Sequence, residues 1–175
     1  MIGGFTAPVR VADRECPAAD QRLSQSVRAF VTAGAGFLLA VLWFDLMFDV
    51  QMLGHRSGEA PERVLGSIAA YYGRVTTSAR PMNRLVAAAM LATIAAVVIE
   101  LADGDYAAWV RWSSLALVLV PVLLAGAHTV PSAVRLGTRS DPPARQSELA
   151  RILLREHMLC FCAVAALIGV QLGAA

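Results

Sequence analysis

The chain has 175 residues, of which 57% are hydrophobic and 16% charged, with a mean hydropathy of +0.59 and a formal net charge of +2. A soluble domain of this length is not normally so apolar, and the charges gather between long apolar runs, as in multi-span membrane proteins. All 15 basic residues other than His are Arg, and no basic patch with interleaved aromatic residues occurs. The composition therefore does not support nucleic-acid binding.

Residues 1–27 mix Arg with acidic residues and contain no apolar core of signal-peptide length, which predicts a flexible N-terminal tail. The first span is predicted at residues 29–53. Its uncharged run, Phe30 to Phe44, would be roughly 22 Å long as a helix, which is short of the roughly 30 Å hydrocarbon core. The helix must therefore continue through Asp45 and Asp49.

The two acids of this span are four residues apart, so both side chains project from one face of the helix. A carboxylate costs about 2.5 to 3.5 kcal/mol at the centre of a membrane helix and less near an interface. We therefore expect Asp45 to face protein or water instead of lipid.

After a turn-rich break at residues 54–61, an amphipathic helix is predicted at residues 62–75, with an apolar stripe of Val64, Leu65, Ile68 and Tyr72. This helix is too short and too polar to span a bilayer. We expect it to lie along the membrane surface, with Tyr71 and Tyr72 at the level of the lipid headgroups.

The remaining spans are predicted at residues 84–102, 112–136 and 149–173. The second span is rich in Ala and the fourth carries Gly169 and Gly173, small residues that favour close helix packing in lipid. Pro121 should kink the third span. The sequence thus predicts an all-α integral membrane four-helix bundle, with residues 28–175 as a single four-span domain and one short interfacial helix between spans 1 and 2.

The distribution of Arg predicts the orientation. The N-terminal tail and the second connection hold half as many Arg residues as the first and third loops, which carry Arg56, Arg63, Arg74, Arg80, Arg84, Arg135, Arg139, Arg145, Arg151 and Arg155. By the positive-inside rule the long loops lie in the cytoplasm and both termini lie outside, in a bacterial-type inner membrane. The Arg-rich face is then suited to anionic lipids.

Helical rise predicts a polar layer near the cytoplasmic side. His128 lies about 24 Å along the third span from Trp112, and His157 lies about one turn inside the fourth span, at depths similar to that of Asp45. The layer would contain Asp45, Asp49, His128 and His157, with Arg135 and Arg155 as charge partners at its rim. Glu100, at the opposite face, is expected to be an interfacial residue within reach of Arg111.

Three readings of this layer are open. Asp45 and His128 are candidate catalytic groups for proton-handling chemistry or transport on a hydrophobic small molecule, since an Asp beside His can exchange protons near neutrality. Alternatively, Asp45, Asp49, His128 and His157 are candidate ligands of a divalent transition metal, although no cofactor is expected from the pattern itself.

In the third reading the acids and imidazoles simply hold the bundle together. The protein would then be an accessory subunit that packs against a membrane protein partner, or against a second copy of itself, through its Ala and Gly faces.

The chain resembles the anthrone-oxygenase-like family of small four-span membrane proteins. The resemblance lies in the polar inner end of the first span, in YYGR at 71–74 before a Pro-led second span, and in HTVPSAVRLG at 128–137. It implies a four-span fold and oxygenation of polycyclic phenols without a bound cofactor. The third-span motif of the family ends in Pro, a small residue and Asn, whereas Ser132 and Ala133 follow Pro131 here. A weaker similarity, to copper-resistance-like membrane proteins, rests on LWFD at 42–45.

Overall fold

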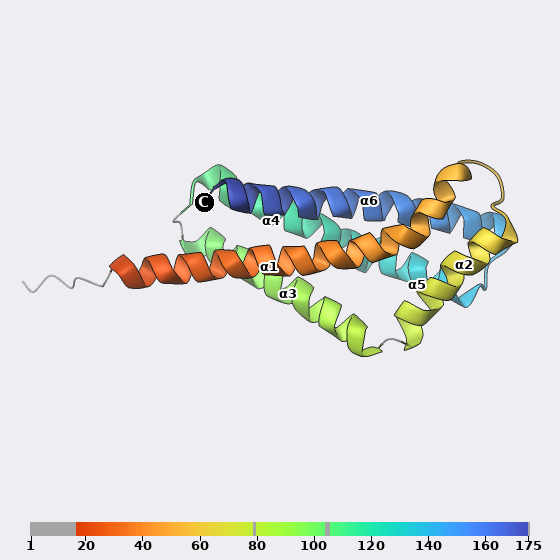
Figure 1. Ribbon diagram of the computed structural model, residues 1–175, viewed down its shortest axis with the longest axis horizontal. Coiled ribbons are helices and arrows are strands. Elements are labelled where there is room, and N and C mark those ends of the chain that lie inside the picture. The colour runs from red at the N-terminus through yellow and green to blue at the C-terminus, as the bar shows by residue number, and fades with distance from the viewer. Residues whose placement is uncertain (1–16, 79, 104–105, 175) are drawn as a thin grey trace, which may run out of the picture.

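The chain is described by a computed structural model over residues 17–78, 80–103 and 106–174. Its elements in order are α1 (Pro17–Asp49), the 3-10 turn η1 (Val50–Gly54), α2 (Glu62–Gly73), the π turn η2 (Arg74–Ser78), α3 (Arg80–Asp103), α4 (Ala108–Leu124), the π turn η3 (Ala125–Thr129), α5 (Val130–Thr138) and α6 (Pro143–Gly173). No strand occurs within these three ranges, so the predicted all-α class is confirmed (Figure 1).

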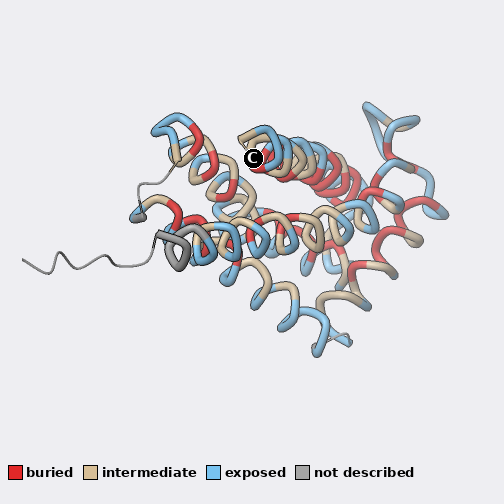
Figure 2. The backbone as a smooth tube through the Cα atoms, turned by 60° about the vertical axis from the view of Figure 1, so that its left-hand side comes forward, coloured by how far each residue is buried: buried red, intermediate tan, exposed pale blue. Residues whose placement is uncertain are grey.

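Four helical segments are long and apolar enough to cross a membrane, namely Arg22–Gly54, Pro81–Ala102, Ala108–Thr138 and Pro143–Gly173. Buried residues lie along the inner sides of the long helices (Figure 2). Large apolar side chains such as Phe30, Leu91 and Leu123 are exposed. An apolar outer surface of this extent requires lipid or protein to cover it. The chain is therefore a multi-pass membrane protein built as a four-helix bundle.

The first and last spans begin earlier in the chain than predicted. Helix α1 starts at Pro17, so residues 17–27 of the predicted tail form its first turns, while residues 1–16 lie outside the described part of the chain. Helix α6 starts at Pro143 instead of near residue 149. In α6 a Pro occupies the first helical position, where its missing N–H is not needed and its fixed φ favours the helix.

The third span consists of α4, η3 and α5 in direct succession. The π turn Ala125–Thr129 lies between Pro121 and Pro131. Each Pro lacks the N–H that would complete an i to i−4 hydrogen bond, so the regular ladder is interrupted on both sides of the turn. The irregular segment therefore sits where the sequence predicts a kink.

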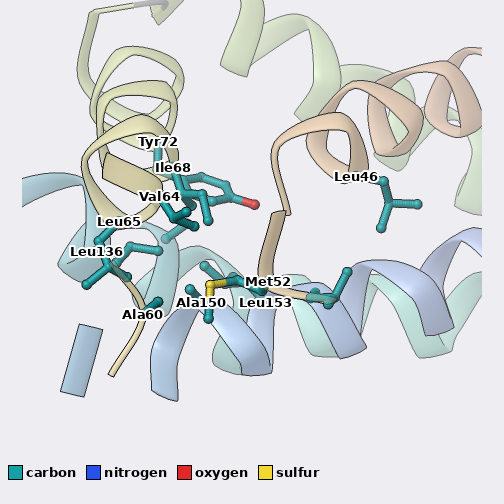
Figure 3. Close-up of a cluster of buried hydrophobic side chains, with 12 residues drawn as sticks. Leu46, Met52, Ala60, Val64, Leu65, Ile68, Tyr72, Leu136, Ala150 and Leu153 are labelled. Carbon is teal, nitrogen blue, oxygen red and sulfur yellow. The ribbon is translucent and has the colours of Figure 1, made fainter. Parts of the chain in front are cut away.

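Two hydrophobic clusters form the interior. The membrane cluster, from all four spans, contains Val31, Ala35, Ala96, Val97, Val118, Val164 and Leu167. The head cluster, around α2, contains Leu46, Met52, Ala60, Val64, Leu65, Ile68, Tyr72, Ala133, Leu136, Ala150, Leu153 and Leu154 (Figure 3). The part of the molecule around this second cluster is called the head below. It lies at the end of the bundle where α1 ends and α6 begins (Figure 1).

The predicted amphipathic helix is α2, and the four residues of its apolar stripe are all buried. They pack into the head cluster against α5 and α6. The hydroxyl groups of Tyr71 and Tyr72, predicted to lie at headgroup level, bond to acidic side chains of α1, and their depth in the membrane stays a prediction. An apolar stripe can be covered by protein as well as by lipid, and the sequence alone did not distinguish the two.

Close packing between helices uses only some of the predicted small residues, together with one that was not predicted. A Cβ atom on Gly34 of α1 would lie 2.2 Å from Thr93 Oγ1 of α3, so these two helices meet at that glycine. Of the Ala residues in α3, Ala96 is buried, whereas Ala87, Ala88 and Ala92 are exposed. Nothing lies within 4 Å of a Cβ placed on Gly169 or Gly173. These two glycines therefore do not mark a packing face within the bundle.

Candidate functional site

Asp45 and Asp49 lie at the head end of α1, one turn apart. The Asp49 side chain is 0% exposed and that of Asp45 is 16% exposed. The two acids face α2 and α6, which supply all their partners. The expectation that Asp45 faces protein thus agrees with its contacts.

Asp49 is held by two donors. The Tyr72 hydroxyl donates to Asp49 Oδ1 at 2.7 Å, and His157 Nδ1 lies 2.6 Å from Asp49 Oδ2. Nδ1 also lies 3.3 Å from the Tyr72 oxygen. A buried carboxylate is tolerated when both of its oxygens accept hydrogen bonds, and here both do.

The contacts of His157 define which ring nitrogen is available for chemistry. Because Asp49 is an acceptor, Nδ1 carries the proton in the hydrogen bond between them. The other nitrogen, Nε2, lies 4.0 Å from Asp45 Oδ2. The Tyr71 hydroxyl donates to the second oxygen of Asp45, Oδ1, at 2.7 Å. The five side chains therefore form one chain of contacts, Tyr71 to Asp45 to His157 to Asp49 to Tyr72, which we call the relay site.

Aromatic rings cover the relay site. The Phe48 and Tyr71 rings stack with centroids 4.1 Å apart and an interplanar angle of 11°. The Tyr72 ring lies 6.3 Å from the His157 ring at 22°. Burial, reinforced by the charges of Asp45 and Asp49, raises the pKa of both tyrosines above the ordinary value. The two hydroxyl groups therefore stay protonated and act as donors to the carboxylates.

The tyrosines owe their position to a close crossing of α2 and α5. A Cβ atom on Gly137 would lie 2.6 Å from the backbone nitrogen of Gly73, which follows Tyr72 in the chain. Only a pair of glycines allows two helix backbones to approach so closely. This crossing brings α2 over α5 and directs Tyr72 across the head cluster (Figure 3).

His128 does not reach the relay site. Its Nδ1 bonds to Glu156 Oε1, and Thr129 donates to Glu156 Oε2 at 2.8 Å. The His128 side chain is 52% exposed. Glu156 precedes His157 on α6, and neighbouring residues of a helix point about 100° apart. The predicted depth of His128 is therefore compatible with its place beside Glu156, but its direction is not that of Asp45.

The predicted charge partners lie elsewhere as well. Arg135 makes two hydrogen bonds to Asp141, from Nε at 3.2 Å and from Nη2 at 2.6 Å, and Arg155 is exposed. Partners for Asp45 and Asp49 come instead from tyrosines and one imidazole. Sequence spacing gave no indication that Asp141, in the loop before α6, would bind Arg135.

The four candidate metal ligands are not assembled into one shell. Asp45, Asp49 and His157 lie together, while His128 is bound to Glu156. Among the residues that the structure describes, no group of three or more His, Cys, Asp or Glu side chains has an arrangement that could hold a metal ion. The four residues therefore do not form the common ligand shell that the sequence suggested.

A second polar cluster lies at the opposite end of the bundle. Glu100 is 3% exposed, and Gln171 Nε2 donates to its Oε2 at 2.9 Å and to Ser114 Oγ at 3.1 Å. Nearby, Arg28 donates to the backbone oxygen of Gln171. Glu100 is thus buried among the spans, whereas the sequence had suggested an interfacial position. Arg111 bonds the backbone oxygen of Leu101 at 2.9 Å.

Comparison with known proteins gives no relative: no family model matches the chain, and neither a curated protein nor a solved structure does. The resemblance to anthrone-oxygenase-like proteins remains an expectation from short motifs.

The two tyrosines and Glu156 were not among the predicted site residues. A signal for Tyr72 was present, since it belongs to the apolar stripe of α2 and a buried tyrosine hydroxyl needs a hydrogen-bond partner. The acids available as partners for this hydroxyl were Asp45 and Asp49, four residues apart on the preceding helix. For Glu156 the signal was weaker, because Glu156 and its neighbour His157 project from different faces of α6.

Proposed function

We propose that the protein transfers protons to and from a hydrophobic small molecule at the head end of its membrane bundle. The observation that carries this proposal is the position of His157, which lies between the buried carboxylate of Asp49 and the partly exposed carboxylate of Asp45. An imidazole that is oriented by a buried carboxylate on one nitrogen is a general acid–base on the other.

The proposed step uses the two ends of this arrangement. Asp45 is the more exposed of the two acids of the relay, and it takes a proton from the bound molecule as the bond between that proton and the molecule breaks. The proton passes to His157 Nε2, across a gap of 4.0 Å that a small side-chain adjustment closes. The imidazolium is stabilised by its hydrogen bond to Asp49. The proton then returns through the same groups to a different atom of the molecule, so the net reaction is a proton shift within that molecule.

The tyrosines stabilise the carboxylates of the site as neutral donors. Tyr71 and Tyr72 each donate one hydrogen bond to a carboxylate, at 2.7 Å in both cases. They lower the cost of keeping two acids within one turn of the same helix. His157 takes the place that the sequence assigned to His128 in this proposal.

We place the protein in a bacterial-type inner membrane with the head in the cytoplasm. The head end carries exposed Arg63, Arg145 and Arg155, and the positive-inside rule favours this orientation. The relay site then opens near the cytoplasmic surface, where protons and water are available. The same Arg residues suit contact with anionic lipid headgroups.

The proposal is tested with the Asp45→Asn variant and a matched control, Glu148→Gln. Glu148 is exposed and pairs with Arg145, so both variants remove one charge but only the first alters the relay. Each protein is expressed in the same cells, and lipid-soluble extracts are compared by mass spectrometry. We expect at least one species to change with Asp45→Asn and none with Glu148→Gln. Identical extracts from cells that make wild-type protein and Asp45→Asn, at equal folded amounts, would falsify the proposal.

A further inference from the structure

A cavity of about 80 Å³ lies among the four spans. Residues from α1, α3, α4, η3 and α6 line it, including Leu42, Met90, Pro121 and Val164, and all but Thr93 are apolar. The Thr93 hydroxyl already donates to the backbone oxygen of Ala89 at 2.7 Å. A cavity with such walls offers no partners to water, so it stays dry and favours hydrocarbon.

The cavity lies in line with the relay site along two helices. On α1, the wall residues Leu38 and Leu42 are followed at helical spacing by Asp45 and Asp49. On α6, the wall residue Val164 lies two turns from His157 on the same face, and both are buried. The apolar space and the acid–base groups are therefore successive parts of one interior stripe.

The burial of the walls indicates where the cavity opens. At the far end Ala35, Thr93 and Leu167 are at most 1% exposed. At the end nearer the relay site, Val86 and Ala125 are only half-buried. Figures 1 and 2 both show α3 leaving the other helices toward its first residues, at this same end. A molecule dissolved in the bilayer can therefore enter between α3 and the third span.

The size of the cavity restricts the shape of the occupant. A volume of about 80 Å³ is roughly half of the about 150 Å³ that admits a benzene ring in an apolar protein cavity. A single alkyl chain is narrower than any ring and fits such a space lengthwise. A polycyclic ring system does not.

We propose that the cavity holds the alkyl chain of a membrane-dissolved amphiphile, whose neutral hydroxyl head lies beside Asp45 and Tyr71. This inference rests on the proposed function of the relay site and specifies its substrate class. The hydroxyl donates to Asp45 Oδ2, because Oδ1 already accepts a bond from Tyr71. An anionic head is disfavoured by the two carboxylates of the site.

The test uses a long-chain primary alcohol with a photoreactive diazirine near the end of its chain. The probe is bound to full-length protein in lipid nanodiscs and irradiated, and the modified peptides are identified by mass spectrometry. We expect modification at Val164 or Leu167, and the unmodified alcohol should suppress it at least fivefold. A polycyclic aromatic alcohol at the same concentration should leave it unchanged. Suppression by the polycyclic compound equal to that by the alkanol overturns the assignment to an alkyl chain.

Three variants separate the cavity from the surrounding lipid. Val164→Phe fills the cavity from its buried side, and Ala125→Leu fills it from the half-buried side with less risk to folding. Leu123→Phe is the control, since Leu123 is 64% exposed on the outer surface. Cavity labelling should fall at least fivefold in each folded cavity variant and stay unchanged in the control. Labelling that persists in folded Ala125→Leu, or that is confined to outward-facing residues, overturns the proposal.

Asp45→Asn distinguishes this inference from the function on which it rests. Weaker cavity labelling in this variant, with an unchanged extent of labelling in Glu148→Gln, supports the position of the hydroxyl head beside Asp45. If cavity filling abolishes labelling but Asp45→Asn leaves it unchanged, the cavity binds alkyl chains and the relay site does not contact the head. That result overturns the head position and the proposed function while the chain site stands.

Discussion

Gly73 and Gly137 meet backbone to backbone where α2 crosses α5, with the backbone nitrogen of Gly73 2.6 Å from the position of a Cβ atom on Gly137. No flexible side chain is available there to move aside, so any larger residue must separate the two helices. Tyr72, one position before Gly73, would move with α2. This contact therefore connects the packing of the head to the hydrogen bonds of the relay site.

Gly137→Ala should destabilise the head by about 1–3 kcal/mol, the usual cost of inserting a methyl group into a closely packed contact. The measurement is the thermal unfolding of purified protein in detergent. Gly169→Ala is the matched control, because nothing lies within 4 Å of its added Cβ and the helix should gain up to about 1 kcal/mol. Equal unfolding temperatures for the two variants would show that α2 and α5 are not in contact at Gly137.

His157→Ala should cost about 3–5 kcal/mol, since it leaves the buried Asp49 carboxylate without its closest donor. Tyr72→Phe removes one hydrogen bond to the same carboxylate and should cost about 1–3 kcal/mol. Chemical unfolding of both variants in detergent micelles gives the comparison. As control, Glu148→Gln breaks an exposed pair with Arg145 and should change stability by less than about 1 kcal/mol. A cost of His157→Ala no larger than that of the control would contradict the buried pairing.

Alkaline pH should destabilise the head through Tyr71 and Tyr72, which belong to α2, outside the four spans. Their pKa values are raised above the ordinary value of 10.0 by burial and by the neighbouring carboxylates. Below pH 10 the folded and unfolded chains are both protonated at these residues, so their contribution does not vary. Above it the unfolded chain loses protons that the folded chain keeps, so stability falls as pH rises, by up to about 1.4 kcal/mol per pH unit from Tyr72.

The pH effect is measured as the unfolding temperature between pH 8 and about pH 11, together with the tyrosinate absorbance of folded protein. The double variant Tyr71→Phe, Tyr72→Phe should show a shallower fall, although it starts from a lower stability. If the wild-type protein and the double variant decline in parallel, the alkaline transition belongs to other groups.

The orientation is tested with single cysteines in a background in which Cys16, Cys160 and Cys162 are replaced by serine. Ala107→Cys lies in the exposed connection before α4, and Glu148→Cys lies on the exposed side of the head. A membrane-impermeant maleimide added to intact cells should label Ala107→Cys alone. Both should react after the cells are opened, which shows that the thiols are accessible. Labelling of Glu148→Cys in intact cells would place the head outside.

The bundle was predictable from sequence because hydropathy and turn residues mark the four spans directly. The start of α6 was predicted too late, since Pro142 and Pro143 resemble a helix-excluding loop although a Pro is well accommodated at the first helical position. The stripe of α2 was predicted correctly, but its burial against α5 and α6 depended on Gly73 and Gly137, which are far apart in the chain.

For the candidate site, the rise per residue of a helix predicted which residues lie at the same level of the bundle. It did not predict the direction in which each side chain points. Asp45, Asp49 and His157 were expected at one level, and the structure brings them together. His128 was expected with them. The π turn Ala125–Thr129 changes the rotation of the third span about its axis, so a residue at the right level can face a different helix. A pattern of 3.6 residues per turn cannot anticipate such a change.

Helices α1 and α6 are joined near both ends of the bundle, by Asp49 and His157 at the head and by Arg28 and the Gln171 carbonyl at the other end. Sliding of one helix along the other by a full turn, about 5.4 Å, would break both hydrogen bonds at once. These two helices thus form a fixed frame. Thickening or thinning of the bilayer must then be absorbed by tilting of this frame as a unit or by displacement of α3, and the acid–base groups keep their spacing in either case.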